Sequence, residues 1–128
     1  MFIIQILLLG NLRDNIKFAN AGIRYFFKSE KNGRIQAIAA ILILLAAWFF
    51  NISPIEWCII LMCISLILSL EMINTALERV CAVISLEYHP MVKTIKDVAA
   101  GAVWLAGIIA IAIGLIVFVP YIKTWLNF

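Results

Sequence analysis

Two carboxylates stand near the end of a long apolar segment of this chain, where a hydrophobic helix would leave a membrane. Between residues 55 and 70 only Glu56 is charged. In a continuous helix, four polar side chains fall at i, i+3, i+4 and i+7 and share one stripe: Glu71, Asn74, Thr75 and Glu78. Carboxylates at bilayer depth are energetically costly and usually functional. The stripe is therefore the first candidate for a chemical site.

Other charged and polar residues are expected on the same side of the membrane as this stripe: Glu30, Asn32, Arg34, Glu87, His89, Lys96 and Asp97. This combination suits metal-assisted phosphoryl transfer, in which one carboxylate accepts a hydroxyl proton, others hold Mg²⁺, and a lysine offsets phosphate charge. The sequence has neither a G-x-x-x-x-G-K-[ST] loop nor a kinase-type glycine-rich loop. The spacing alone suggests this chemistry without specifying it.

The composition places these residues in a membrane protein. The chain has 128 residues, of which 66% are hydrophobic and 13% charged, and its mean hydropathy is +1.10. A soluble domain of this size needs a far more polar surface. Each membrane-spanning helix takes about 20 residues, so three spans and their connections use the whole chain. We expect one all-α integral membrane domain covering residues 1–128.

Four helical segments are predicted to position the polar residues. Apolar residues recur at helical spacing over about residues 11–32, which predicts an amphipathic helix at the membrane surface. Asn32 and Gly33 predict the turn that ends it. The spans are expected at about residues 34–50, 54–83 and 96–119. Residues 1–10 are apolar but too short to span, and we expect an interfacial or disordered lead-in.

The basic residues predict the orientation. Six of the ten Lys and Arg residues precede the first span, three lie between the second and third, and one follows the third. The connection between the first two spans has none. The positive-inside rule then places the N-terminus and the second connection in the cytoplasm and the C-terminus outside. Because Glu71 and Glu78 lie at that inner side, they face the compartment that contains ATP.

The motifs E-x-x-N-T-A-x-E-R, E-Y-H-P and K-D-x-A-A-G-A-V, which follow G-I-[RK]-x-x-x-K-x-E-x-N-x-R, cover roughly residues 16–119. In order and spacing the chain resembles the small prokaryotic membrane diacylglycerol kinase family, and within it the undecaprenol kinase branch. The resemblance implies a homotrimer of three-span subunits in the bacterial inner or plasma membrane. It implies active sites between subunits, which transfer the γ-phosphate of ATP to a lipid hydroxyl, with Mg²⁺ as cofactor. No nucleic acid is expected as a partner.

The resemblance also assigns roles residue by residue. Glu71 matches the catalytic base, Asn74 matches the polar residue beside it, and Glu30 and Glu78 match the metal-holding carboxylates. Positions that contact the nucleotide are matched by Glu78, Glu87, Tyr88, His89, Lys96 and Asp97. Positions in the surface-helix and lipid-access region are matched by Arg24, Asn32 and Arg34.

Plainer interpretations exist for several of these residues. The two carboxylates of the stripe could form a structural pair satisfied by Arg79, Lys96 or water at the helix interface. Glu30 and Arg34 could form a surface i,i+4 pair. His89 by itself would be a loop histidine at a helix start.

The chain also departs from the family, because Ala82 stands where the family usually has an aspartate. A catalytically impaired member acting as a membrane binding or assembly protein is therefore an alternative. A proton-coupled transporter using Glu71 is weaker, since three short spans lack the repeats and broken helices of such folds. The sequence does not choose between diacylglycerol and undecaprenol as the acceptor.

Overall fold

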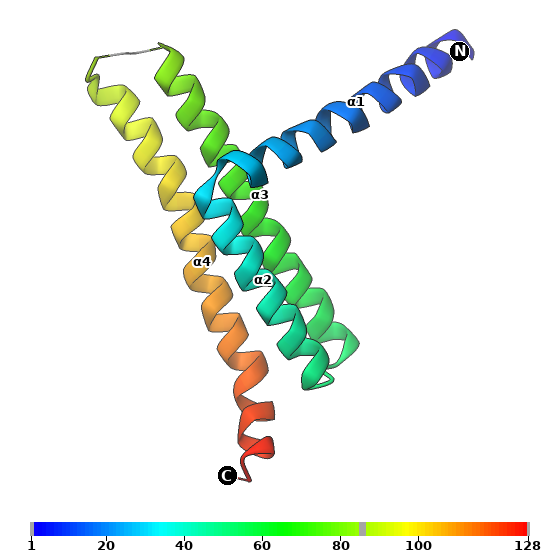
Figure 1. Ribbon diagram of the computed structural model, residues 1–128, viewed down its shortest axis with the longest axis vertical. Helices are drawn as coiled ribbons and strands as arrows, with labels where there is room; N and C mark the ends of the chain where they lie inside the picture. Colours follow the sequence, from blue (N-terminus) through cyan, green and yellow to red (C-terminus); the bar gives the residue numbers. More distant parts are fainter. Residues whose placement is uncertain (1, 85–86, 128) are drawn as a thin grey trace.

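The computed structural model describes residues 2–84 and 87–127, which fold into four helices with no strand among them. The helices are α1 (Phe2–Ser29), α2 (Lys31–Phe49), α3 (Pro54–Ile84) and α4 (Pro90–Trp125). In Figure 1, α2, α3 and α4 run side by side, and α1 projects away from them as a single arm. By length and composition α2, α3 and α4 could each cross a membrane. The prediction of an all-α protein with three such helices is confirmed.

The α2–α3 hairpin turns sharply because its residues favour the required backbone. Asn51 adopts a left-handed conformation with φ of 50°, which asparagine tolerates better than most residues. Ser53 and Glu56 then form a capping box: the Ser53 N–H donates to Glu56 Oε2 at 2.8 Å, and the Glu56 N–H donates to Ser53 Oγ at 3.3 Å. Pro54 begins α3, a position where its missing N–H costs nothing.

The last helix extends beyond the predicted span at both ends. His89 caps α4 by accepting a hydrogen bond from the Met91 N–H at 3.2 Å, and Pro90 follows at the first helical position. Helix α4 therefore begins six residues before Lys96. At the other end it continues through Pro120 to Trp125, and Tyr121 donates a hydrogen bond to Glu56 of α3 at 2.6 Å.

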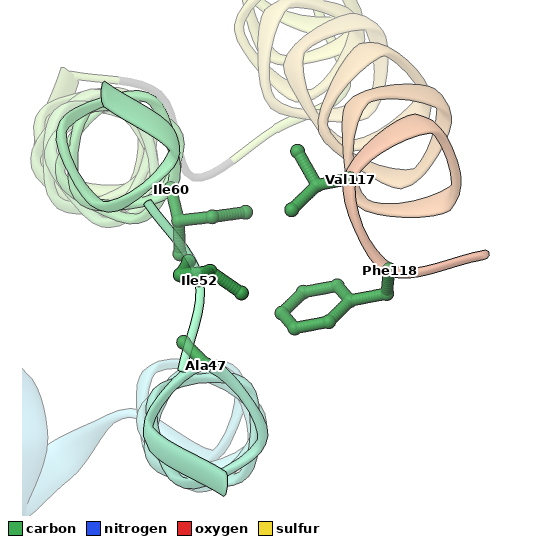
Figure 2. Packing of buried hydrophobic residues seen from close by; sticks show 5 residues of the cluster. All are labelled: Ala47, Ile52, Ile60, Val117 and Phe118. Atoms are coloured by element: carbon green, nitrogen blue, oxygen red, sulfur yellow. The ribbon is translucent and has the colours of Figure 1, made fainter. Parts of the chain in front are cut away.

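The hydrophobic core lies at the end of the bundle that carries the α2–α3 hairpin. Its buried members come from all three helices and the hairpin: Ala47, Ile52, Ile60, Val117 and Phe118. Figure 2 shows Val117 and Phe118 of α4 pointing toward Ile60, Ile52 and Ala47. Most other apolar side chains of α2, α3 and α4 are exposed in the single chain. Such a surface suits contact with lipid or with further copies of the chain.

The break between α1 and α2 differs from the predicted turn. Helix α1 ends at Ser29, Glu30 is extended with φ −102° and ψ 119°, and α2 begins at Lys31. Asn32 and Gly33 therefore lie in the first turn of α2, so the turn predicted at these two residues is wrong. Gly33 has a different reason to be glycine: a Cβ there would lie 2.6 Å from the ring of Phe26.

The apolar lead-in also belongs to α1. From Phe2 its backbone continues without interruption into the predicted surface helix. Its start, Met1, lies outside the described residues. Among the residues that the structure describes, α1 contacts only α2 and α3 of the bundle, at the end of α1 that adjoins it (Figure 1). The break at Glu30 therefore determines the direction of the arm.

Candidate active site

The polar stripe of α3 turns inward at the position of the predicted base. Glu71, Asn74 and Thr75 are buried, with 6%, 8% and 9% of their surfaces exposed. Glu78, one turn after Asn74 on α3, is exposed. The structure thus separates a buried carboxylate from a solvent-accessible one on the same helix, about 10 Å apart along the axis at 1.5 Å per residue.

Two buried side-chain oxygens, one on α2 and one on α3, have no partner among the described residues. They are Asn74 Oδ1 and Gln36 Oε1. Buried acceptors are normally satisfied, so each one calls for a donor that the isolated chain does not supply. Gln36 was missed by the sequence reasoning. It is the only polar residue between Arg34 and Phe50, and that isolation in an apolar span is the signal that could have found it.

A cavity of about 480 Å³ opens between the end of α3 and the start of α4. It is lined by Glu78, Cys81, Ala82, Glu87, Tyr88, His89, Val92, Lys93, Lys96 and Asp97. Every residue that the resemblance assigned to the nucleotide lies in this lining. The volume falls within the range of small-molecule sites. We call it the α3–α4 cavity.

Both positively and negatively charged side chains line the α3–α4 cavity. Helix α4 presents its N-terminus here, where the helix dipole favours anions. Lys93 and Lys96 add positive charge, and Lys93 forms an ion pair with Asp97 on the next turn. Because His89 Nδ1 accepts the Met91 N–H, its ring is the tautomer that carries hydrogen on Nε2. A phosphate-bearing ligand would find several donors together.

Within residues 2–84 and 87–127, no hydrogen-bonded ion pair joins Glu71 or Glu78 to Arg79 or Lys96, or Glu30 to Arg34. Arg79 donates to Glu30 instead, with 2.5 Å between Arg79 Nη2 and Glu30 Oε1. Arg34 caps the C-terminus of α1: its Nη1 donates to the carbonyl oxygens of Lys28 at 2.8 Å and Phe27 at 3.4 Å. Arg34 therefore holds the break at Glu30 and makes no pair with it, so the i,i+4 interpretation is wrong.

The remaining predicted residues are not brought into the α3–α4 cavity. Arg24 is exposed on α1, and Asn32 is exposed in the first turn of α2. Buried Glu71 and Asn74 lie earlier on α3 than Glu78 and do not line the cavity. In this chain alone the predicted lipid-side and nucleotide-side residues occupy adjoining but separate places.

The predicted metal carboxylates fit a cation that arrives with phosphates. Within residues 2–84 and 87–127, no group of three or more His, Cys, Asp or Glu side chains is placed to hold a metal ion. Mg²⁺, however, is usually held by one or two carboxylates together with substrate phosphates and water. Glu78 is exposed, and Glu30 is bonded to the residue that follows Glu78 in α3. These two carboxylates suit such a site.

Comparison with known proteins identifies the family. The family model described as prokaryotic diacylglycerol kinase matches residues 17–118. The undecaprenol kinase of Bacillus subtilis is 39% identical over 102 residues, covering 80% of this chain and 83% of the relative. Diacylglycerol kinases are 35% identical over 105 residues in Synechocystis (81% and 60%) and 28% over 98 residues in Haemophilus influenzae (77% and 83%). The chain belongs to the prokaryotic diacylglycerol kinase family and is a membrane lipid kinase.

Proposed function

We propose that this protein transfers the γ-phosphate of ATP to the hydroxyl of a membrane lipid alcohol, with Mg²⁺ bound to the nucleotide. The observation that carries the proposal is the α3–α4 cavity, where Lys93, Lys96 and the N-terminus of α4 converge next to the exposed carboxylate Glu78. The named relatives are all lipid kinases, and none supports the alternative of a non-catalytic assembly protein.

In the proposed reaction each residue has a distinct task. Glu71, which is buried, accepts the proton of the lipid hydroxyl. At the same time the hydroxyl oxygen bonds to the γ-phosphorus, and the bond between that phosphorus and ADP breaks. Asn74, one turn after Glu71 on α3, orients the incoming alcohol by donating from its side-chain N–H₂ to the hydroxyl oxygen, which leaves the alcohol's single proton to Glu71. Lys96 offsets the negative charge that develops on the transferring group.

The nucleotide is held by the lining of the α3–α4 cavity. Tyr88 and His89 lie where the nucleotide base could stack on their rings and accept a hydrogen bond from them. Glu87 and Asp97 accept hydrogen bonds from the hydroxyl and amino groups of the nucleotide. Glu30 and Glu78 would hold Mg²⁺, which neutralises phosphate charge when bound. Arg24, Asn32 and Arg34 lie near the corner between α1 and α2, where a lipid would approach.

We further propose that three copies assemble so that each site is completed by a neighbouring subunit. The exposed apolar surface of α2, α3 and α4 supports this, as do the unpartnered acceptors of Gln36 and Asn74. The distribution of basic residues supports an N-terminus in the cytoplasm and a C-terminus outside, in the bacterial inner or plasma membrane. Residues 1–128 then act as a single lipid-kinase domain.

The experiment that tests the reaction is radiolabelled phosphate transfer from Mg-ATP in mixed micelles, to undecaprenol and separately to diacylglycerol. We expect transfer, with undecaprenol preferred because the relative matched at 39% is an undecaprenol kinase. Glu71→Gln keeps the size of the side chain but removes the proton acceptor, so its turnover should fall at least 100-fold.

The matched control is Glu56→Gln, the same substitution at the other end of α3, where the side chain contacts Ser53 and Tyr121. It should keep most of the activity. Normal turnover in Glu71→Gln would exclude Glu71 as the base, and no transfer from wild-type protein to either lipid would reject the proposed reaction.

A further inference from the structure

Arg79 makes the ion pair that joins α3 to the corner between α1 and α2. Its Nη2 lies 2.5 Å from Oε1 of Glu30, which is 49 positions earlier in the sequence. The side chain of Glu30 is 22% exposed and that of Arg79 is 59% exposed. Neither the motif nor the family resemblance gave Arg79 a role, and it does not line the α3–α4 cavity.

The backbone of Glu30 is already fixed without Arg79. Arg34 caps the end of α1, and the Glu30 N–H donates to the Phe26 carbonyl at 2.9 Å. Gly33 packs directly under the ring of Phe26. What these contacts leave undetermined is the direction of the Glu30 carboxylate. Arg79 determines that direction by donating a hydrogen bond to one of the two carboxylate oxygens of Glu30.

The second oxygen of Glu30 is left for another ligand. An ionised carboxylate offers about four lone-pair sites, and Arg79 uses Oε1 only, with no bond to Oε2 within residues 2–84 and 87–127. Arg79 directly follows Glu78 on α3, so the pair keeps the Glu30 carboxylate beside the helical turn that carries Glu78. The pair thereby brings a carboxylate from the α1–α2 corner to the turn of α3 that carries a second carboxylate.

We infer that Arg79 is a positioning residue, which orients the Glu30 carboxylate so that Oε2 can bind the divalent cation of the nucleotide together with Glu78. The inference rests on the proposed function, because it takes Glu30 and Glu78 as the cation ligands. An ion pair this exposed contributes little to stability. Its main effect should therefore be on cation affinity, since groups that orient a metal ligand typically change that affinity by 10- to 100-fold.

The test is Mn²⁺ binding, followed by electron paramagnetic resonance, to the purified full-length protein in detergent with a non-hydrolysable ATP analogue. Arg79→Gln should raise the Mn²⁺ dissociation constant about tenfold, and Arg79→Lys should recover part of the loss because it keeps the charge. Lys28→Gln is the matched control: it removes a positive charge from the last turn of α1 and should bind Mn²⁺ like wild type.

The double variant decides whether Arg79 acts through Glu30. If it does, Glu30→Gln with Arg79→Gln should bind Mn²⁺ no more weakly than Glu30→Gln alone. Unchanged Mn²⁺ affinity in Arg79→Gln, a double loss equal to the product of the two single losses, or no Mn²⁺ binding by wild-type protein would each overturn the inference. Lipid phosphorylation is measured in parallel and tests the proposed function alone. If Arg79→Gln weakens Mn²⁺ binding as expected but the wild-type protein transfers no phosphate to lipid, only the proposed function is refuted.

Discussion

At the scale of single residues, the site combines groups that are poorly satisfied in the isolated chain. Asn74 is 8% exposed, and its Oδ1 has no partner within the described residues. Leaving a buried acceptor unpaired costs about 1–3 kcal/mol, and such costs tend to be retained where function needs them. Asn74 is therefore a residue whose presence lowers the stability of the isolated chain and whose removal should lower activity.

Asn74→Leu tests this trade-off. It replaces the amide with an apolar side chain of similar size, so the free energy of unfolding should stay unchanged or rise by about 1 kcal/mol. Phosphate transfer to the lipid should fall at least tenfold. The measurements are thermal unfolding in detergent and the radiolabel assay. Thr75→Val, the neighbouring buried polar position, is the control and should keep its activity; equal losses in both variants would contradict a specific role for Asn74.

At the scale of elements, the corner between α1 and α2 is the feature that sequence patterns located least well. The dipeptide Asn32 and Gly33 has the composition of a turn, yet it lies inside the first turn of α2. Glycine is required there because the ring of Phe26 occupies the space of a Cβ. Turn composition describes two residues, whereas this contact depends on how the last turn of α1 packs against the first turn of α2 across the break at Glu30.

Gly33→Ala should therefore destabilise the corner. The added Cβ would lie 2.6 Å from the Phe26 ring, and relieving that clash should cost about 1–3 kcal/mol of unfolding free energy. Gly22→Ala is the matched control. Its Cβ meets nothing within 4 Å, so it should stabilise α1 by roughly 0.5–1 kcal/mol. Thermal unfolding of both variants measures the difference, and a Gly33→Ala variant as stable as Gly22→Ala would contradict the packing argument.

At the scale of the whole molecule, stability and chemistry are placed at opposite ends of the bundle. The hydrophobic core and the bond from Tyr121 to Glu56 lie at the hairpin end. The α3–α4 cavity and the Glu30–Arg79 pair lie toward the other end of α3. Glu56 and Glu71 are separated by 15 residues of continuous helix, about 22 Å. Changes at the hairpin end should therefore affect unfolding without altering catalysis.

Tyr121→Phe makes that separation measurable. It removes a hydrogen bond to a charged acceptor, which typically contributes about 1.5–3 kcal/mol, and it keeps the ring that packs against Phe50. The unfolding temperature should fall while the Michaelis constant for ATP and the turnover number stay at wild-type values. A changed Michaelis constant for ATP would show that the two ends are coupled.

The sequence by itself determined the membrane class, the three long helices, and the stripe from Glu71 to Glu78, because hydropathy and helical period are local properties of the chain. Only the tertiary structure decided the break at Glu30, the pairing of Glu30 with Arg79, and the unpartnered oxygen of Gln36. The break depends on contacts across the α1–α2 corner, and the pairing joins residues 49 positions apart. The missing partner of Gln36 becomes visible only when its neighbours are placed around it. Side-chain spacing along one helix carries no information about which neighbour will lie opposite.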